Sequence, residues 1–567
     1  MQRHVAGLGV ATRDRALFIG VEIVLFNITY TSLNFIFFVL ATMLVYFLFP
    51  AKKYKWTVLL AASMFFYAVA GYRFAFFILF TTLSTYLIAL WIERISTQSK
   101  KLLKAKKSDW SRDQKKAYKN KIKVQKRLVM TLALVINFGI LAFLKYYNFF
   151  AGSLNDILGG FGIGFSAPTL NLFLPLGISF YTFQSMGYIV DVYREKTGAQ
   201  RNPFKLLLFV SFFPQIVQGP ISIYDQLAHQ LFEPHDFDFT RVKHGMELIL
   251  WGFCKKLIIA DRAVIAINTV TADYGSFGGS TLTFTILMYA LQLYADFSGG
   301  IDISRGVAQI FGIDMIDNFK RPYFSKSINE YWRRWHISLG AWLKNYLFYP
   351  IAMSNVFLNA SKKMKGTRFG KTAAGAHIAK VLPTSVASLI VFLVVGIWHG
   401  ADWKYVAFGV WNGGIIMLSI LLQPVFDSIV ARLHIRRESA WYSVFQMLRT
   451  FIVVLVGYVF DVAPSFGDGM NTIFRFFTNQ NFSQLGADIS KLGLLPNDFI
   501  VLIVGVLLIL FVSILQERNP STDIRTMLDQ KPFALRFVLL YLGVMAVLVF
   551  GIYGSGYNAA DFVYMQF

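Results

Sequence analysis

Two histidines in this sequence directly follow a tryptophan, and both lie where acid–base chemistry is possible. His399 ends an apolar run that begins at Leu389, and a second apolar run extends from Trp403 to Leu422. A titratable side chain placed this deep in apolar sequence is costly and marks a functional candidate. Imidazole can take a hydroxyl proton near neutral pH, so His399 is a candidate general base. The alternative is a structural histidine bonded to a backbone carbonyl at a helix end.

His336 ends a cluster of aromatic and basic residues, because residues 331–336 are Tyr-Trp-Arg-Arg-Trp-His. Arg333 and Arg334 suit contact with an anionic donor such as a phosphate-bearing thiol carrier. A belt of aromatic and arginine side chains at the level of the lipid headgroups explains the cluster equally well. Asp296 lies at the end of another apolar segment, where it could position a histidine or an arginine or be a simple helix-end acid.

Several known catalytic and ligand-binding patterns are missing from the sequence. Residues 366–372 resemble a phosphate loop, but one residue is missing between the first glycine and the Gly-Lys pair. No nucleophile elbow and no zinc-binding histidine motif occurs. Cys254 is the only cysteine, which excludes a disulfide scaffold. We therefore expect no metal site and no bound cofactor.

The composition indicates a membrane protein. Of the 567 residues, 56% are hydrophobic and only 15% are charged, whereas soluble domains are nearer one quarter charged. Since a span needs roughly 20 apolar residues, we expect an all-α polytopic membrane protein with about eleven or twelve transmembrane helices. The candidate spans are 33–49, 56–70 with 74–92, 128–147, 171–190, 204–220, 245–270, 281–298, 384–398, 402–422, 443–461, 499–515 and 533–553.

Two of these segments contain residues that break a helix. Residues 174–177 are Leu-Pro-Leu-Gly, and residues 213–220 begin with Phe-Pro and end with Gly-Pro. Broken backbone at membrane depth is tolerated only where protein or a water-filled cavity surrounds it. We expect both segments to be re-entrant and to line a cavity, with an ordinary kinked helix as the alternative.

The formal net charge of +24 is concentrated between apolar segments. Residues 100–127 contain thirteen lysines and arginines against two aspartates, which predicts a cytoplasmic loop. Residues 462–498 contain one arginine and one lysine, and we expect them outside. No nucleic-acid recognition fold accompanies the charge, so we expect anionic membrane lipids as its partner and no nucleic acid.

The domain organisation follows from these segments. We expect one integral-membrane domain over 33–553, with a basic insertion at 355–382. An N-terminal extension over 1–32, expected as an interfacial helix, precedes it, and a C-terminal tail over 554–567 follows it.

Five blocks, in the same order, resemble the membrane-bound O-acyltransferase superfamily on its bacterial alginate and peptidoglycan O-acetyltransferase side. They are 175–184, 213–220, 296–299, 331–339 and 398–400, and the likeness extends over roughly residues 33–420. The resemblance implies a helical bundle around a tunnel that crosses the membrane. It maps the signature histidine of the family onto His399 and the second active-site histidine onto His336. The residues expected along the donor tunnel are Trp398, Trp335, Arg333, Arg334 and Asp296.

The resemblance also implies a reaction in the bacterial inner membrane. An acetyl group would pass from a cytoplasmic thioester, acetyl-CoA or another acyl thioester, to a hydroxyl outside. The acceptor would be a cell-surface polysaccharide or an extracytoplasmic partner, such as a polysaccharide acyltransferase or a serine hydrolase-like protein. His399 would act as general base, and His336 would position or polarise the thioester.

Three alternatives remain open at this point. D-alanyl transfer to teichoic acids is less favoured, because that branch is shorter and typically has an asparagine before its Arg-Trp-His. A secondary transporter or lipid flippase would also contain broken helices and buried polar residues, but the matching halves typical of transporters are absent. A non-catalytic assembly platform is the third alternative.

Overall fold

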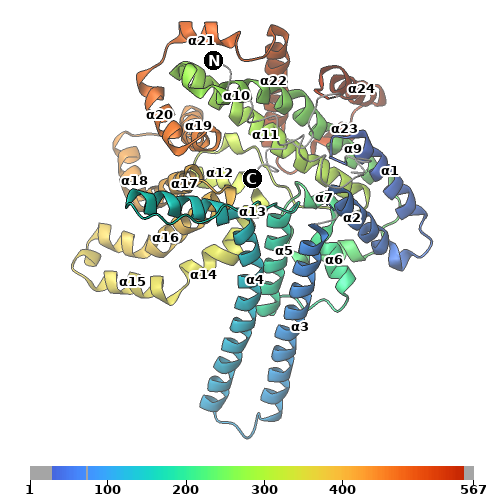
Figure 1. Ribbon diagram of the computed structural model, residues 1–567, viewed down its shortest axis with the longest axis vertical. Helices are drawn as coiled ribbons and strands as arrows, with labels where there is room; N and C mark the ends of the chain where they lie inside the picture. Colours follow the sequence, from blue (N-terminus) through green and yellow to red (C-terminus); the bar gives the residue numbers. More distant parts are fainter. Residues whose placement is uncertain (1–27, 72–73, 554–567) are drawn as a thin grey trace.

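The computed structural model describes residues 28–71 and 74–553, and these fold almost wholly into helices (Figure 1). Within these residues the only β-type contact is an isolated bridge between Phe319 and Trp335. The prediction of an all-α protein is confirmed. The predicted extension over 1–32 lies mostly outside the described residues, and the tail over 554–567 lies wholly outside them.

Seven helices in the described part of the chain are long and apolar enough to cross a membrane. They are α3 (Ala75–Ala105), α4 (Arg112–Gly160), α16 (Ala373–His399), α17 (Trp403–Leu421), α19 (Ala440–Val462), α22 (Pro496–Arg518) and α24 (Phe533–Phe550). The protein is therefore a multi-pass membrane protein.

This number is lower than the about eleven or twelve spans expected at roughly 20 residues each, because the other apolar segments are shorter or divided. α1 (Leu33–Leu48) has 16 residues. The predicted span 245–270 is divided among α9 (Phe239–Phe253), a π-helix (Cys254–Ala260) and α10 (Asp261–Ala272). Chain breaks of this kind depend on packing against neighbouring helices, which hydropathy alone does not report.

α11 (Gly279–Ile310) is the longest buried helix, and α9 packs closely along it. Glycines make this approach possible. A Cβ atom at Gly252 would lie 2.7 Å from the carbonyl oxygen of Gly299, and one at Gly245 would lie 2.7 Å from that of Gly306. Gly245 and Gly252 are seven residues apart on α9, and Gly299 and Gly306 are seven residues apart on α11. The two backbones therefore meet along a seam of small residues, as is common in membrane proteins.

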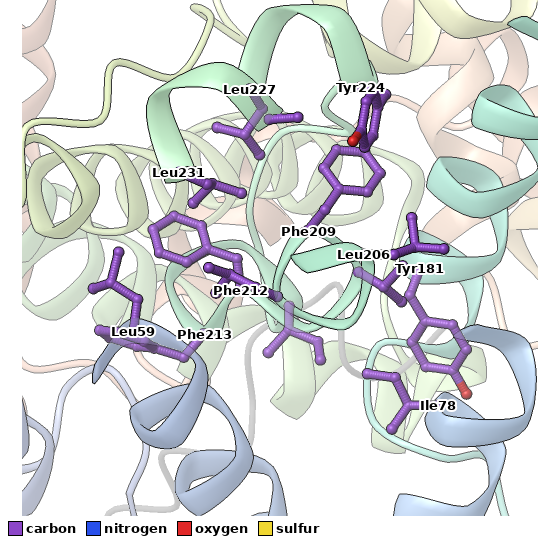
Figure 2. Close-up of a cluster of buried hydrophobic side chains, with 14 of the residues drawn as sticks. Leu59, Ile78, Tyr181, Leu206, Phe209, Phe212, Phe213, Tyr224, Leu227 and Leu231 are labelled. Atoms are coloured by element: carbon purple, nitrogen blue, oxygen red, sulfur yellow. The ribbon is translucent and has the colours of Figure 1, made fainter. Parts of the chain in front are cut away.

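The break predicted at 213–220 lies inside the protein. α6 (Pro203–Ser211) and α7 (Phe213–Ile216) meet at Phe212, and every residue from 211 to 220 is buried. Figure 2 shows the aromatic and aliphatic side chains packed around this break: Leu59, Ile78, Tyr181, Leu206, Phe209, Phe212, Phe213, Tyr224, Leu227 and Leu231. Protein therefore surrounds this broken backbone. That the segment is re-entrant and lines a cavity stays a prediction.

The second break packs directly against the first. Gly177 precedes α5 (Ile178–Tyr193) with φ +69°, a left-handed conformation that favours glycine. A Cβ atom there would clash with the carbonyl oxygen of Ile216. The hydroxyl of Tyr30 donates a 2.7 Å hydrogen bond to the carbonyl of Pro214, which satisfies a backbone group that the break leaves outside regular helix bonding.

α3 and α4 form an antiparallel hairpin that projects from the rest of the molecule (Figure 1). The sequence predicted a basic loop over 100–127, but only residues 106–111 are non-helical. Lysine and glutamine are good helix formers, and a capping box at Ser111 begins α4. The remaining helices of eight or more residues are α2 (Lys55–Gly71), α8 (Tyr224–Phe232), α15 (Asn355–Gly366), α18 (Gln423–Arg432), α20 (Phe466–Thr478) and α21 (Phe482–Ile489).

Candidate active site

His336 and His399 line the same buried cavity. The other lining residues are Tyr289, Leu293, Phe297, Trp332, Trp335, Phe408, Tyr458 and Asp461. The cavity measures about 20 Å³, which is room for about one water molecule. The structure therefore brings together two histidines that lie 63 positions apart in the sequence.

His399 is the last residue of α16, and α4 holds this helix end in place. The ammonium of Lys145 donates a hydrogen bond to the carbonyl of Trp398, and the hydroxyl of Tyr146 donates one to the carbonyl of Ile397 at 2.9 Å. Helix ends leave carbonyls without partners inside the helix. Two of them here are bound by a transmembrane neighbour, which fixes the position of His399.

α16 also packs unusually closely on α17 just before His399. A Cβ atom at Gly396 would lie 2.9 Å from the backbone nitrogen of Gly409. The ring of His399 packs against Phe408 of α17, with 5.0 Å between the ring centres. The small residue at 396 thus lets the two helices close against each other beside the histidine.

His336 occupies an irregular connection between α12 (Ile328–Arg334) and α13 (Ile337–Leu343). Its φ of 47° is left-handed, and its side chain is 2% exposed. Its Nδ1 lies 3.2 Å from Oδ1 of Asn318, an oxygen that also accepts the backbone N–H of Ser338 at 2.9 Å. Because that oxygen can only accept, Nδ1 of neutral His336 carries the proton and Nε2 is the basic nitrogen.

Trp335 lines the cavity and Trp398 lies beside His336, while their expected place along a donor tunnel stays a prediction. The ring centre of Trp398 lies 6.1 Å from that of His336, and Trp335 stacks on Tyr331 at 5.6 Å. The hydroxyl groups of Tyr331 and Tyr458 are joined by a 2.6 Å hydrogen bond. The cavity wall is thus mainly aromatic, with few polar groups.

Asp461 is a cavity residue that the sequence analysis missed. It lies near the end of α19, its side chain is 3% exposed, and its Oδ1 lies 4.0 Å from Nδ1 of His399. This distance is too long for a hydrogen bond, but a carboxylate there stabilises a protonated imidazole. The available signal was an acid ending an apolar span, the same signal that selected Asp296.

Asp296, Arg333 and Arg334 are not among the residues that line the cavity. Asp296 is buried and accepts a hydrogen bond from Lys256 at 2.6 Å. Arg334 pairs with Glu330 at 2.7 Å and with Glu517 at 3.1 Å.

Arg333 is exposed on α12. Its neighbours Trp332 and Trp335 line the cavity. Arg333 does not, because consecutive residues of a helix face different directions. A donor-binding role for the two arginines remains a prediction. Over residues 28–71 and 74–553, no group of three histidine, cysteine or acidic side chains is placed to hold a metal ion.

These features define a multi-pass, all-α membrane protein with a pair of histidines in an aromatic interior cavity. Residues 194–367 match the model of the membrane-bound O-acyltransferase family. This range includes His336 and the α12–α13 connection. A protein named "Peptidoglycan O-acetyltransferase" from Helicobacter pylori is 30% identical over 433 residues, covering 70% of each chain. The chain belongs to the membrane-bound O-acyltransferase family.

Two further relatives differ in how much of the chain they match. "Probable alginate O-acetylase AlgI" from Pseudomonas syringae pv. tomato is 33% identical over 331 residues, which is 58% of this chain and 57% of that relative. The match thus spans a little over half the length of that relative. "Teichoic acid D-alanyltransferase" from Bacillus subtilis is 28% identical over 306 residues, covering 52% of this chain and 71% of that protein.

Proposed function

We propose that this protein is an O-acyltransferase that moves an acetyl group from a cytoplasmic thioester, such as acetyl-CoA, to a hydroxyl outside the bacterial inner membrane. The acceptor is a polysaccharide of the cell envelope or an extracytoplasmic partner that passes the acetyl group on. The observation that carries this proposal is the pair of histidines on one buried cavity. Family membership and the names of the two O-acetylating relatives support it.

D-alanyl transfer is the second candidate, and it is less well supported. The D-alanyltransferase relative matches 52% of this chain at 28% identity, whereas the peptidoglycan O-acetyltransferase relative matches 70% at 30%. The sequence also lacks the asparagine that typically precedes Arg-Trp-His in the D-alanyl branch.

In the proposed reaction His399 takes the proton of the acceptor hydroxyl. The hydroxyl oxygen attacks the thioester carbonyl carbon, a C–O bond forms, and the C–S bond breaks. The proton then passes to the leaving thiolate. Asp461, 4.0 Å from His399, stabilises the imidazolium between these two steps.

His336 acts from another side of the same cavity. With Nδ1 bonded to Asn318, Nε2 is the basic nitrogen, and it orients the thioester in the proposed reaction. The aromatic wall excludes water that would hydrolyse the thioester. A cavity of about 20 Å³ admits little more than a hydroxyl oxygen, so the donor widens it on binding.

The orientation follows from charge. The basic hairpin region 100–127 is cytoplasmic and the region 462–498 is external. The donor thus approaches from the side of the hairpin, and the acceptor approaches from the opposite side.

Sealed membrane vesicles with the cytoplasmic face outward test this proposal when they are given acetyl-CoA labelled in the acetyl group. We expect covalent label on an acceptor in the lumen, and we expect His399→Gln to abolish it, because glutamine cannot take a proton. His377→Gln is the matched control on α16, since His377 bonds the carbonyl of Ile420 away from the cavity. Passage of intact solute without covalent transfer would indicate a transporter, and retained transfer in His399→Gln would refute the assignment of the base.

A further inference from the structure

A basic cleft opens where the α3–α4 hairpin leaves the bundle. Its charged lining residues are Lys100 of α3, Lys119, Lys123 and Lys126 of α4, and Glu195 just after α5. The cleft has a volume of about 390 Å³. It is separate from the histidine cavity and shares no lining residue with it.

The charges of the basic cleft are only partly balanced. Glu195 pairs with Lys100 and with Lys126, each at 2.7 Å. In the part of the chain that the structure describes, no acidic side chain forms an ion pair with Lys119 or Lys123. Four lysines against one carboxylate leave an excess of three positive charges, so the basic cleft attracts an anion.

The basic cleft is also rigid on its inner side. Lys126 is 7% exposed, and its ammonium lies 5.5 Å from the ring centre of Tyr193. One of its partners, Tyr193, is the last residue of α5, a helix that is buried in the bundle, and the other, Glu195, lies in the turn that follows. The inner wall of the basic cleft is thus joined to the core through Tyr193 of α5 and the buried Lys126.

The position of the basic cleft relative to the membrane indicates which anion it binds. The apolar part of α4 begins at Leu128. At 1.5 Å of rise per residue, Lys126 lies about 3 Å, Lys123 about 8 Å and Lys119 about 14 Å beyond that edge along the helix. The polar headgroup layer extends roughly 5–8 Å beyond the hydrocarbon on each side. Lys126 and Lys123 therefore lie within or at the edge of the layer of lipid phosphates, and Lys119, about 6 Å or more beyond it, reaches back toward the layer with its long side chain.

We propose that the basic cleft binds the headgroup phosphate of an anionic membrane lipid, with Lys119 and Lys123 donating hydrogen bonds to the phosphate oxygens. Lys100 and Lys126 hold Glu195 and shape the inner wall. Lysine ammonium groups bind phosphate well as point charges. The fixed wall distinguishes this site from the diffuse attraction of the other exposed lysines on the hairpin.

The test uses the purified full-length protein in neutral detergent, titrated with phosphatidylglycerol or with phosphatidylcholine, and measures bound lipid by native mass spectrometry. The test variant is Lys119→Gln/Lys123→Gln. The matched control is Lys101→Gln/Lys121→Gln, which removes two charges from exposed hairpin positions outside the basic cleft. A hydrogen bond to a charged group contributes roughly tenfold or more to binding, whereas a lysine outside the site makes no such bond.

We expect the test variant to bind phosphatidylglycerol roughly 100-fold more weakly, because two hydrogen bonds to the phosphate are lost. We expect the control to stay within about twofold of the wild type and phosphatidylcholine to bind weakly to all three. An equal loss in both variants would mean diffuse attraction and would overturn the proposal. No loss in the test variant would overturn it as well. Displacement of the lipid by coenzyme A would assign the basic cleft to the thioester donor instead. A thermal melt of each variant confirms that both remain folded.

Discussion

Paired charges are buried in the interior around the histidine cavity, but they are exposed at the end of the α3–α4 hairpin. In the interior, Lys256 is 1% exposed and pairs with Asp296 at 2.6 Å and with Asp261 at 2.7 Å. On the hairpin, the side chain of Lys100 is 69% exposed although it also pairs with a carboxylate. Removal of an interior charge leaves its partner buried without compensation. Removal of a hairpin charge leaves its partner exposed, where water solvates it.

This difference separates what the two regions can do. The interior fixes the helices that carry the histidines, so its polar groups serve the fold and the chemistry together. The projecting end of the hairpin, residues 100–127, contributes little to that framework, so its lysines can recognise the membrane surface. The following changes test this separation, beginning with the largest expected effect.

Removal of one interior charge is expected to be the most damaging change to stability. Asp296→Ala leaves the ammonium of Lys256 buried with one carboxylate fewer, at a cost of roughly 3–5 kcal/mol. A thermal melt of the detergent-solubilised protein measures this loss. Asp427→Ala is the control, since its pair with Arg437 is exposed and contributes little to stability. Equal melting of the two variants would remove the distinction between the regions.

Asp461 is expected to affect catalysis more than folding. Asp461→Asn keeps the shape of the side chain but removes the charge 4.0 Å from His399. We expect kcat to fall roughly 10- to 100-fold with KM unchanged, because a charge pair at this distance stabilises the protonated histidine by a few kcal/mol. Asp402→Asn is the control, since Asp402 caps α17 through a bond that asparagine can also make. A raised KM with normal kcat would assign Asp461 to substrate binding.

The smallest expected effect concerns Glu195, which follows α5 and pairs with two lysines of the hairpin. Lys100 and Lys126 lower the pKa of the Glu195 carboxyl from its ordinary value of 4.5 to about 2. Since the pKa is lower in the folded protein, the stabilisation is complete above pH 4.5 and is lost as the pH falls toward 2. The side chain is 38% exposed, so the contribution is below about 1 kcal/mol. Melting of the wild type and of Glu195→Gln should differ at pH 7 and converge near pH 2; a difference independent of pH would argue against the ion pairs.

The sequence predicted the parts of this molecule that depend on local pattern. His399 was found because it ends an apolar run, and His336 because tryptophans and arginines surround it. The all-helical membrane class followed from hydropathy alone. The high charge of residues 100–127 predicts a loop, but these residues are mostly helical. Their lysines are good helix formers, a property that charge alone does not report.

The remaining features depend on contacts between distant segments. Lys145 reaches the carbonyl of Trp398 across 253 positions of sequence, and Asp461 reaches His399 from another helix. The left-handed backbone at His336 arises from its bonds with residue Asn318 and the start of α13, not from any local turn residue. The number of spans differed for a similar reason, because tertiary packing divides several apolar segments into shorter helices.

The measurement that bears most directly on the shared cavity is the kcat/KM for acetyl transfer in His336→Gln, His399→Gln and the double variant. General acid–base groups each contribute about 10²–10⁴-fold, and groups that act in one step are not additive. If both histidines act on one reacting centre, the double variant should lose clearly less than the product of the two single losses. A double loss equal to that product would mean that the two histidines work independently and that their common cavity is not the site of the reaction.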